Sequence, residues 1–185
     1  MNRDEALQLV KDYIKNEKMI AHCLASEAVM RALAEHLGED IEKWGLAGLL
    51  HDLDAETTDY DMKRHGLETE KILREKGLDE ESIEAIKLHN EDADHGQQRS
   101  TKFHHALAAG ETITGLIFAT ALVYPDKKLE SVKPKSITKR MKEKAFAASV
   151  NRDTVCECEK LGLSVNEFAE LALNAMKKIA PQIGF

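Results

Sequence analysis

No part of this sequence carries the signals of a β-strand. The 185 residues include only ten glycines and three prolines, no Asn-Gly or Asp-Gly hairpin pair, and no run of alternating β-branched residues. A chain of this length can bury a core without disulfides or a structural metal. We therefore expect one all-α protein, a compact helical bundle. Because it would not need a metal to fold, any bound metal is expected to serve a chemical function.

Capping residues and glycine stops divide the chain into helices. The expected helices span about 3–16, 19–37, 40–53, 62–76, 80–90 and 101–123. Two or three more follow Pro134, the last running from near Ser164 to before Pro181. The residues predicted to cap or end helices are Asn2, Gly38, Gly77 and Asp79. Residues 90–100 are polar and predict a loop.

Charge and composition argue against several classes of protein. With 26 basic and 33 acidic residues the formal net charge is −7, so the surface as a whole does not predict binding to nucleic acid polymers. The longest uncharged stretch, residues 112–125, is shorter than the about 20 residues of a membrane span. Residues 1–5 have no apolar signal core behind them. We expect a cytoplasmic protein without membrane contact. Its three cysteines are expected to be reduced and to have no functional role.

One segment reverses the sign of the charge. Residues 127–144 hold eight basic and two acidic side chains, so this basic segment carries +6 and the remainder of the chain −13. Such a run is typical of a solvated helical face. The alternative is a local site for a phosphate-bearing ligand, provided that phosphate chemistry takes place nearby.

The strongest local signal is an apolar helix that ends in an imidazole and a carboxylate. Residues 44–50 carry no charge, and His51 and Asp52 follow directly. A helix that is apolar on all sides is predicted to be buried, and Gly45 and Gly48 leave room for a neighbouring element. A carboxylate carried into a core must be ion-paired, hydrogen-bonded or bound to a cation.

Further polar side chains lie on apolar faces, or at their ends, in separate predicted helices. They are His22, His65, His89 and Glu111. A hydrogen-bonded core residue explains any one of them. Together with His51 and Asp52, however, they favour a metal site, and imidazole with carboxylate suits Zn, Fe, Mn, Ni or Co rather than Ca.

In this order the residues resemble a known family. His22, His51-Asp52, His65-Gly66, His89 and an acidic residue within Ala-Ala-Gly-Glu111-Thr resemble the HD-domain superfamily of metal-dependent phosphohydrolases, over about residues 18–120. The resemblance implies a metal-binding helical domain over residues 1–124, with its site at the centre. Extra C-terminal helices over residues 125–185 would pack on the same domain.

The resemblance also implies the roles of these residues. His22, His51, Asp52 and Glu111 would hold a first metal, and Asp52 would bridge to a second metal held by His65 and His89. The cofactor would be one or two divalent ions (Fe, Mn, Ni, Co, Zn or Mg), and Asp52, His65 and His89 would form the catalytic centre.

One departure from the family concerns the last ligand. The family normally has Asp where this chain has Glu111, and the extra methylene moves the carboxylate by about 1.5 Å. The longer side chain would bind with a different geometry, draw partly away, or weaken the first metal site. Asp92 and Asp94 are poorer substitutes because they lie in the polar loop after His89.

The implied chemistry is hydrolysis of a phosphate mono- or diester by a metal-bound hydroxide. The expected partner is a small phosphorylated substrate, such as a nucleotide or a similar metabolite, and a homodimer is left open. Candidates to hold it lie near the predicted ligands, or in the basic segment if that segment folds back over the site: Lys63, Arg64, Lys102, His104, Lys135, Lys139 and Arg140. His105 adjoins His104, whereas His36 and His95 need only a surface explanation.

Two other functions are left open by the sequence. The inositol oxygenases resemble this pattern of ligands too, with two irons that activate dioxygen instead of water. A pocket with Glu111 in place of Asp could also bind a nucleotide or a metal and only signal, without catalysis.

Overall fold

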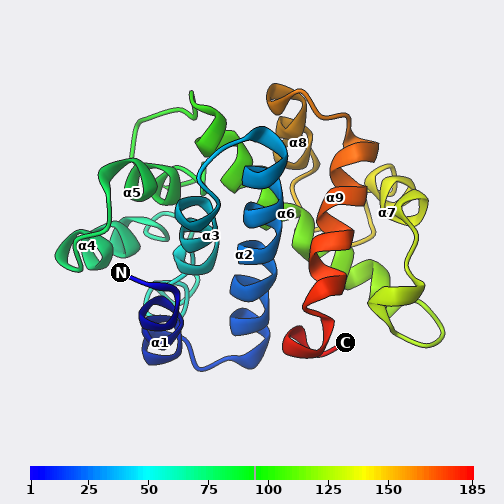
Figure 1. Ribbon diagram of the computed structural model, residues 1–185, viewed down its shortest axis with the longest axis horizontal. Helices are drawn as coiled ribbons and strands as arrows, with labels where there is room; N and C mark the ends of the chain where they lie inside the picture. The colour runs from blue at the N-terminus through cyan, green and yellow to red at the C-terminus, as the bar shows by residue number, and fades with distance from the viewer. Residues whose placement is uncertain (94) are drawn as a thin grey trace.

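The computed structural model describes residues 1–93 and 95–185, and these residues form helices and loops with no strand (Figure 1). This confirms the predicted all-α class. Asp94 lies outside the described residues. The α-helices are α1 (Arg3–Tyr13), α2 (Glu17–Leu37), α3 (Ile41–Leu50), α4 (Leu67–Glu75), α5 (Glu80–Lys87), α6 (Lys102–Leu122), α7 (Pro134–Met141), α8 (Arg152–Cys156) and α9 (Val165–Lys178). Short 3₁₀ helices cover Leu129–Ser131, Glu157–Leu161 and Ala180–Ile183.

Several helix ends follow the predicted caps. The side chains of Asn2 and Asp79 accept backbone N–H groups at the starts of α1 and α5, and Ser164 does the same for α9. Helix α2 ends at Gly38, whose φ of 72° lies in the left-handed region that glycine adopts without strain.

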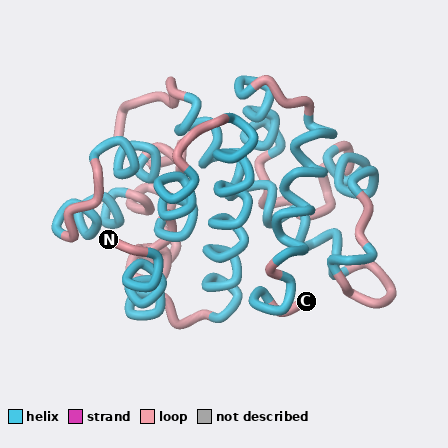
Figure 2. The backbone as a smooth tube through the Cα atoms, viewed as in Figure 1, coloured by secondary structure: helices cyan, strands magenta, loops and turns pink. Residues whose placement is uncertain are grey.

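Two helix ends differ from the prediction in a way that matters for the site. Helix α3 stops at Leu50 rather than near residue 53, and α4 starts at Leu67 rather than near residue 62. Residues 51–66 form consecutive turns between them, as the loops of Figure 2 show. Asp52 and His65 are therefore carried by turns, whereas His51 is the C-cap of α3 and keeps helical backbone angles (φ −60°, ψ −31°).

Helices α2 and α6 form the centre of the bundle. Helix α2 packs against α3 on one side and α9 on the other, and α6 crosses behind them (Figure 1). The approach of α2 and α3 depends on Gly48, because a Cβ atom there would lie 2.7 Å from the carbonyl oxygen of Ser26. This confirms the predicted reason for a glycine on this face of α3.

The last third of the chain shares the core of the first two thirds. Helix α9 packs against α2, α6 and α7, and its buried Phe168 and Leu173 belong to the same apolar cluster as Leu33 and Leu107. Among the described residues, α6 is the one helix long and apolar enough to cross a membrane by length and composition, and 67% of its most apolar window is buried inside the fold.

Candidate metal centre

The residues predicted as metal ligands converge on one cavity of about 350 Å³. His22 comes from α2 and Glu111 from the middle of α6, while the others come from turns: His51 and Asp52 after α3, His65 before α4, and His89 after α5. Five of them line the cavity. His51 is fully buried directly behind it.

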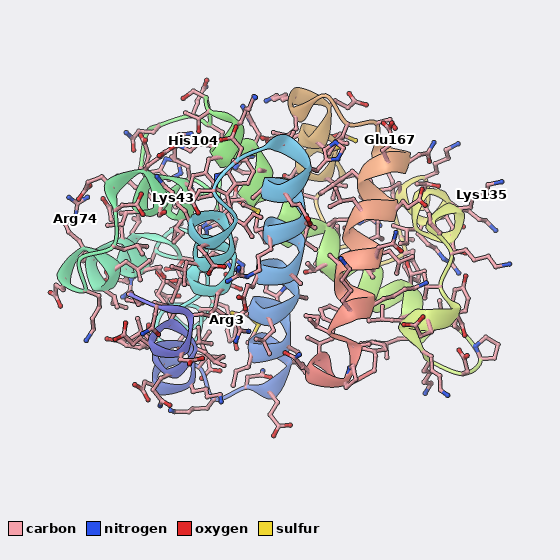
Figure 3. All side chains as sticks on the ribbon, in the orientation of Figure 1. Arg3, Lys43, Arg74, His104, Lys135 and Glu167 are labelled. Atoms are coloured by element: carbon pink, nitrogen blue, oxygen red, sulfur yellow. The ribbon has the colours of Figure 1, made fainter. Side chains whose placement is uncertain are left out.

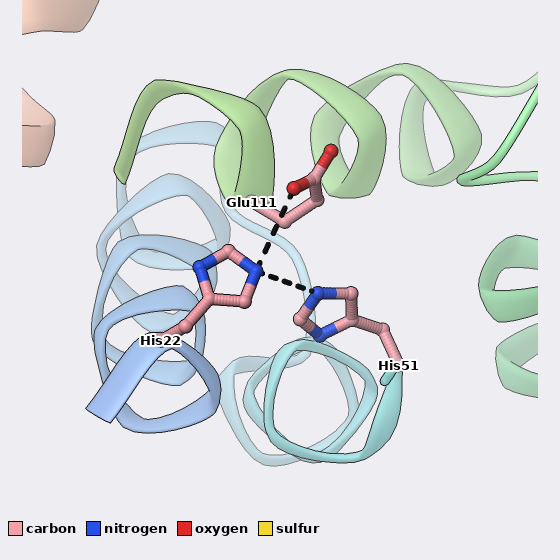
Figure 4. A group of neighbouring side chains, drawn as sticks. All are labelled: His22, His51 and Glu111. Atoms are coloured by element: carbon pink, nitrogen blue, oxygen red, sulfur yellow. Dashed lines mark hydrogen bonds and ion pairs between the residues drawn. The ribbon is translucent and has the colours of Figure 1, made fainter. Parts of the chain in front are cut away.

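The first group of ligand atoms surrounds the Nε2 atom of His22. This atom lies 3.1 Å from Nε2 of His51, 3.3 Å from Oδ2 of Asp52 and 3.7 Å from Oε2 of Glu111. Figure 4 shows the three side chains of His22, His51 and Glu111 pointing toward one another from α2, from the end of α3 and from α6. Such a set of imidazole and carboxylate donors could hold one metal ion.

The second group surrounds the other oxygen of Asp52. Its Oδ1 atom lies 3.1 Å from Nε2 of His65 and 3.6 Å from Nε2 of His89, and these two nitrogens are 3.0 Å apart. Oδ1 is also 3.2 Å from Nε2 of His51. Asp52 therefore stands between the two groups, with one oxygen toward His22 and the other toward His65 and His89.

The hydrogen bonds of the imidazoles test whether these residues fit a metal. In each histidine, Nδ1 faces an oxygen outside the cluster: Thr114 Oγ1 for His22, the Gly48 carbonyl for His51, Asp54 for His65 and the Ile86 carbonyl for His89. These acceptors place the proton on Nδ1 and leave a lone pair on Nε2.

The free lone pairs then face one another in pairs. The two Nε2–Nε2 distances of 3.0 and 3.1 Å are hydrogen-bond distances, yet in the neutral imidazoles neither nitrogen of a pair carries a proton to donate. Without metal, the raised pKa of His65 places a proton in the second pair. Lone pairs that approach so closely repel unless a positive charge lies between them. The residues present therefore fit a divalent cation in each group.

Thr114 and Asp54 orient two of the imidazoles. The hydroxyl of Thr114 donates to the carbonyl of Glu111 at 2.7 Å, so its oxygen is left to accept from Nδ1 of His22. Asp54 is fully buried and accepts from Nδ1 of His65 at 2.7 Å. Both partners were missed in the sequence, although Asp54 has a signal there, since it is a second carboxylate two residues after Asp52.

The Asp54 carboxylate also caps the start of α4. It accepts backbone N–H groups of Gly66, Glu68 and Thr69 at distances between 2.8 and 3.1 Å. Burial opposes the charge, but the hydrogen bonds from His65 and from the backbone outweigh it and lower the pKa of Asp54. One ionised side chain thus fixes both the helix that follows His65 and the imidazole itself.

Without metal, the ionisation of the cluster is set by burial and by these neighbours. Burial lowers the pKa of His51 to about 3 and raises the pKa of Glu111 to about 8. Burial also disfavours charge on His65, but its hydrogen bonds to the carboxylates of Asp52 and Asp54 prevail and raise its pKa to about 10. A positive charge is therefore favoured between these two carboxylates, where a bound cation would supply it.

Glu111 reaches the first group despite its departure from the family residue. Its Oε2 atom points at His22, and its Oε1 atom accepts a hydrogen bond from the hydroxyl of Thr112. The side chain is about four-fifths buried. The structure thus places Glu111 beside the other predicted ligands of the first metal.

The wall of the cavity comes largely from segments without a sequence signal for the site. Residues 90–92 and 149–151 form part of it, together with Met19, Tyr60 and Gly115. Asn151 of the C-terminal part donates to Glu91 at 2.6 Å and so joins the two segments. No spacing rule relates positions that lie 60 residues apart, and this part of the wall needed the three-dimensional structure.

Two residues predicted to contact the substrate lie at the start of α6 and have other partners. Lys102 is exposed, 3.9 Å from Glu39. His104, labelled in Figure 3, completes the cap of the helix by accepting the backbone N–H of Thr101 at 3.4 Å. Neither residue lines the cavity. His105, which adjoins His104, faces Glu157 instead, at 2.5 Å.

The basic segment does not cover the cavity either. Lys135 and Lys139 line a separate hollow on the α7 side of the molecule, where Figure 3 labels Lys135. Arg140 pairs with Glu143 and lies 4.3 Å from the ring centre of Phe146. Their positions do not support the expected contact with a substrate, because the chain passes over the cavity only later, at residues 149–154.

Lys63 and Arg64 are exposed on the turn between Tyr60 and His65. They lie next in sequence to Met62, which lines the cavity, but are not part of the lining themselves. Their role in binding a substrate stays a prediction.

Comparison with known proteins agrees with this geometry. A family model described as HD domain matches residues 19–122, which is more than half of the chain and includes all the predicted ligands. Neither the curated proteins nor the solved structures gave a match to this chain. On the strength of the family match and of the His and Asp residues that it covers, this chain belongs to the HD-domain family.

Proposed function

We propose that this protein is a metal-dependent phosphohydrolase that cleaves an ester of phosphate in a small metabolite. Membership of the HD-domain family supports hydrolysis, because most of this family are metal-dependent hydrolases. The observation that carries the proposal is the position of Asp52, whose two oxygens face two separate sets of histidines at 3.1–3.6 Å.

Two divalent ions at such a centre would lower the pKa of a water molecule and neutralise charge on the attacked phosphoryl group. The residues of the chain supply the rest. Asp52 would bridge the two ions, and His22, His51 and Glu111 would hold one of them while His65 and His89 hold the other. Thr114 and Asp54 keep the imidazoles of His22 and His65 turned so that Nε2 faces the ion.

The cavity offers no activated nucleophile of its own among the described residues. Its hydroxyl groups belong to Tyr60, Thr112, Ser149 and Thr154. Thr112 donates to Glu111 and Thr154 to Glu91, and none of the four is hydrogen-bonded to a histidine. Water is therefore the nucleophile that this arrangement supports.

The first experiment is metal analysis of the purified protein, followed by a screen of phosphorylated metabolites with Mn, Co, Ni, Fe and Mg. We expect bound divalent metal and release of inorganic phosphate. Turnover that consumes dioxygen and needs iron would instead identify an oxygenase. Tight binding of nucleotides without release of phosphate in any of the metals would identify a signalling protein.

Glu111 can be tested separately from the rest of the centre. We expect Glu111→Ala to lose about one of two bound ions, and Glu111→Asp to keep part of the affinity of the first site. Glu75→Ala is the matched control, because this exposed carboxylate lies on α4 away from the cavity. Unchanged metal content and rate in both Glu111 variants would show that Glu111 is not a ligand.

A further inference from the structure

The lining of the metal cavity has an unusual charge for a site that binds phosphate. Among the described residues that form it, none is Lys or Arg, whereas four are acidic: Asp52, Glu91, Asp92 and Glu111. The remaining side chains are the histidines and neutral groups. Among the described lining residues, the positive charge that meets the substrate phosphate is therefore left to the metal ions.

A charge balance shows how much negative charge the centre accepts. Two divalent ions bring four positive charges, and the carboxylates of Asp52 and Glu111 neutralise two of them. One phosphate dianion neutralises the other two. A second anionic group on the substrate would then find no counter-charge and would face Glu91 and Asp92.

Glu91 and Asp92 are the two described carboxylates of the cavity that are not proposed as metal ligands, and the protein does not fully balance their negative charges. Glu91 accepts hydrogen bonds from Asn151 and Thr154 and pairs with Arg99, but the same guanidinium also pairs with Glu157 at 2.6 Å, so Glu91 has no cation to itself. The side chain of Asp92 forms no hydrogen bond or ion pair in the described part of the chain, and it is exposed at the cavity. This end of the cavity is thus suited to a positive charge.

An aromatic ring lies at the opening of the same cavity. Tyr60 is 52% exposed and Met62 is 47% exposed, although both side chains are large and mostly apolar. Asp59 and Tyr60 both have positive φ, 53° and 58°, and the N–H of Tyr60 is held by the carbonyl of Ala55 at 2.9 Å. A bulky residue rarely adopts this backbone conformation, so the turn holds the ring at the opening at some cost.

An exposed ring that lines the same cavity as carboxylates is a typical recognition site for an organic ammonium ion. We propose, on the basis of the hydrolytic function proposed above, that the substrate is a phosphomonoester of a small amino alcohol. Its phosphate would lie at the metal centre, and its ammonium group near Tyr60 and Asp92. In the reaction the oxygen of water bonds to phosphorus, the bond between phosphorus and the ester oxygen breaks, and that oxygen takes a proton. The products are inorganic phosphate and the amino alcohol.

Three two-carbon esters test this preference with the phosphate held constant. Phosphoethanolamine carries a positive leaving group, 2-hydroxyethyl phosphate a neutral one and phosphoglycolate a negative one. We expect kcat/KM of the metal-loaded protein to fall in that order, by at least about tenfold between the first and the last. Equal values of kcat/KM for the three esters would overturn the inference and leave the hydrolytic function standing. A preference for phosphoglycolate, which contact with Lys63 or Arg64 would produce, would overturn it in the same way.

Two variants assign the preference to named side chains. Asp92→Asn and Tyr60→Leu should each reduce the ratio of kcat/KM for phosphoethanolamine over 2-hydroxyethyl phosphate by several fold. Glu75→Gln, which removes the same charge from a distant surface, should keep the native ratio. A native ratio in both cavity variants would show that these side chains do not recognise the ammonium group.

Failure of hydrolysis is distinguishable from failure of the charge preference. If the metal-loaded protein cleaves none of the three esters, they are stable ligands and their dissociation constants can be measured by calorimetry. Tighter binding of phosphoethanolamine would then support the proposed site for the ammonium group and contradict the proposed hydrolysis. Binding that does not depend on the charge of the leaving group would overturn both.

Discussion

The chemistry of the centre depends on which nitrogen of each histidine is left free. Protein oxygens occupy Nδ1 in His22, His51, His65 and His89, so all four Nε2 atoms face inward. This arrangement is built from one hydroxyl, two backbone carbonyls and one carboxylate. Of these partners Asp54 is the one charged group, and it therefore offers the sharpest test at the level of a single residue.

We predict that Asp54→Asn weakens the metal bound by His65 and His89. An amide in this place keeps the shape but turns an N–H group toward donors, so it loses hydrogen bonds from the imidazole and from the start of α4. The expected loss of affinity is about 10–100-fold, measured by metal titration. Asp61→Asn, an exposed neighbour on the same turn, is the control. Native affinity for both ions in a folded Asp54→Asn protein would contradict the role given to Asp54.

At the level of helices, the position of His51 depends on how closely α3 approaches α2. Gly48 lies against the backbone of Ser26, and its carbonyl also accepts the Nδ1 proton of His51. Gly45, one turn earlier, lies against the side chain of Arg31. A backbone neighbour cannot move aside without moving its helix, whereas a flexible side chain can.

We therefore predict that Gly48→Ala is much more destabilising than Gly45→Ala. The new methyl group at position 48 must push the helices apart, at a cost of about 1–3 kcal/mol, and would displace His51 with them. At position 45 a shift of Arg31 and the better helix propensity of Ala offset much of the cost. Urea unfolding of the two variants measures the difference, and equal free energies of unfolding would argue against the close contact at Gly48.

The cavity wall also depends on Arg152, the first residue of α8. The guanidinium of Arg152 donates to the carbonyls of Ala147 and Val150, both at 2.6 Å, and to that of Phe146. Val150 lines the cavity. A single side chain thus holds the turns that carry this part of the wall.

We predict that Arg152→Lys loosens this wall without releasing the metal. One ammonium group cannot bond to several diverging carbonyls as the planar guanidinium does. Backbone hydrogen exchange over residues 143–150 should become faster and KM should rise, with metal content unchanged. Arg74→Lys on the exposed surface of α4 is the control. Native exchange rates over residues 143–150 would show that Arg152 does not hold the wall.

The sequence was sufficient for most of the helices and for the group of polar residues that meet at the cavity, because both have local signals. Caps such as Asn2 and Asp79 act within three residues, and each proposed ligand is a polar group in an otherwise apolar setting. The wall has no such signal. The alternative that the basic segment folds back over the cavity was raised by its charge, yet a later segment that includes Asn151 lies there, since packing of the C-terminal helices decides which surface faces the cavity.

At the scale of the whole molecule, metal should stabilise a fold that already has a complete core. The buried cluster extends from α1 to the C-terminal 3₁₀ helix, so we expect the metal-free protein to remain folded. An ion that binds only the native state adds about 2.7 kcal/mol when its concentration is 100 times its Kd.

We predict that a chelator lowers Tm by about 10–20 °C, since two such ions add about 5.4 kcal/mol and about 1 kcal/mol changes Tm by roughly 2–4 °C in a protein of this size. Asp52→Ala should show almost no response to the chelator, because it lacks the shared ligand of both ions. Thermal unfolding with and without chelator measures this. An equal drop in Tm for the native and the Asp52→Ala proteins would place the stabilising metal elsewhere.

The most direct test combines metal content with phosphate release on the same samples of native and Asp52→Ala protein. We predict two divalent ions per chain and hydrolysis of a phosphomonoester in the native protein. The folded Asp52→Ala variant should lose both ions and the activity together, because Asp52 is, among the described residues, the carboxylate whose two oxygens face both histidine groups. An Asp52→Ala protein that keeps its metal and its full rate would contradict the two-ion centre.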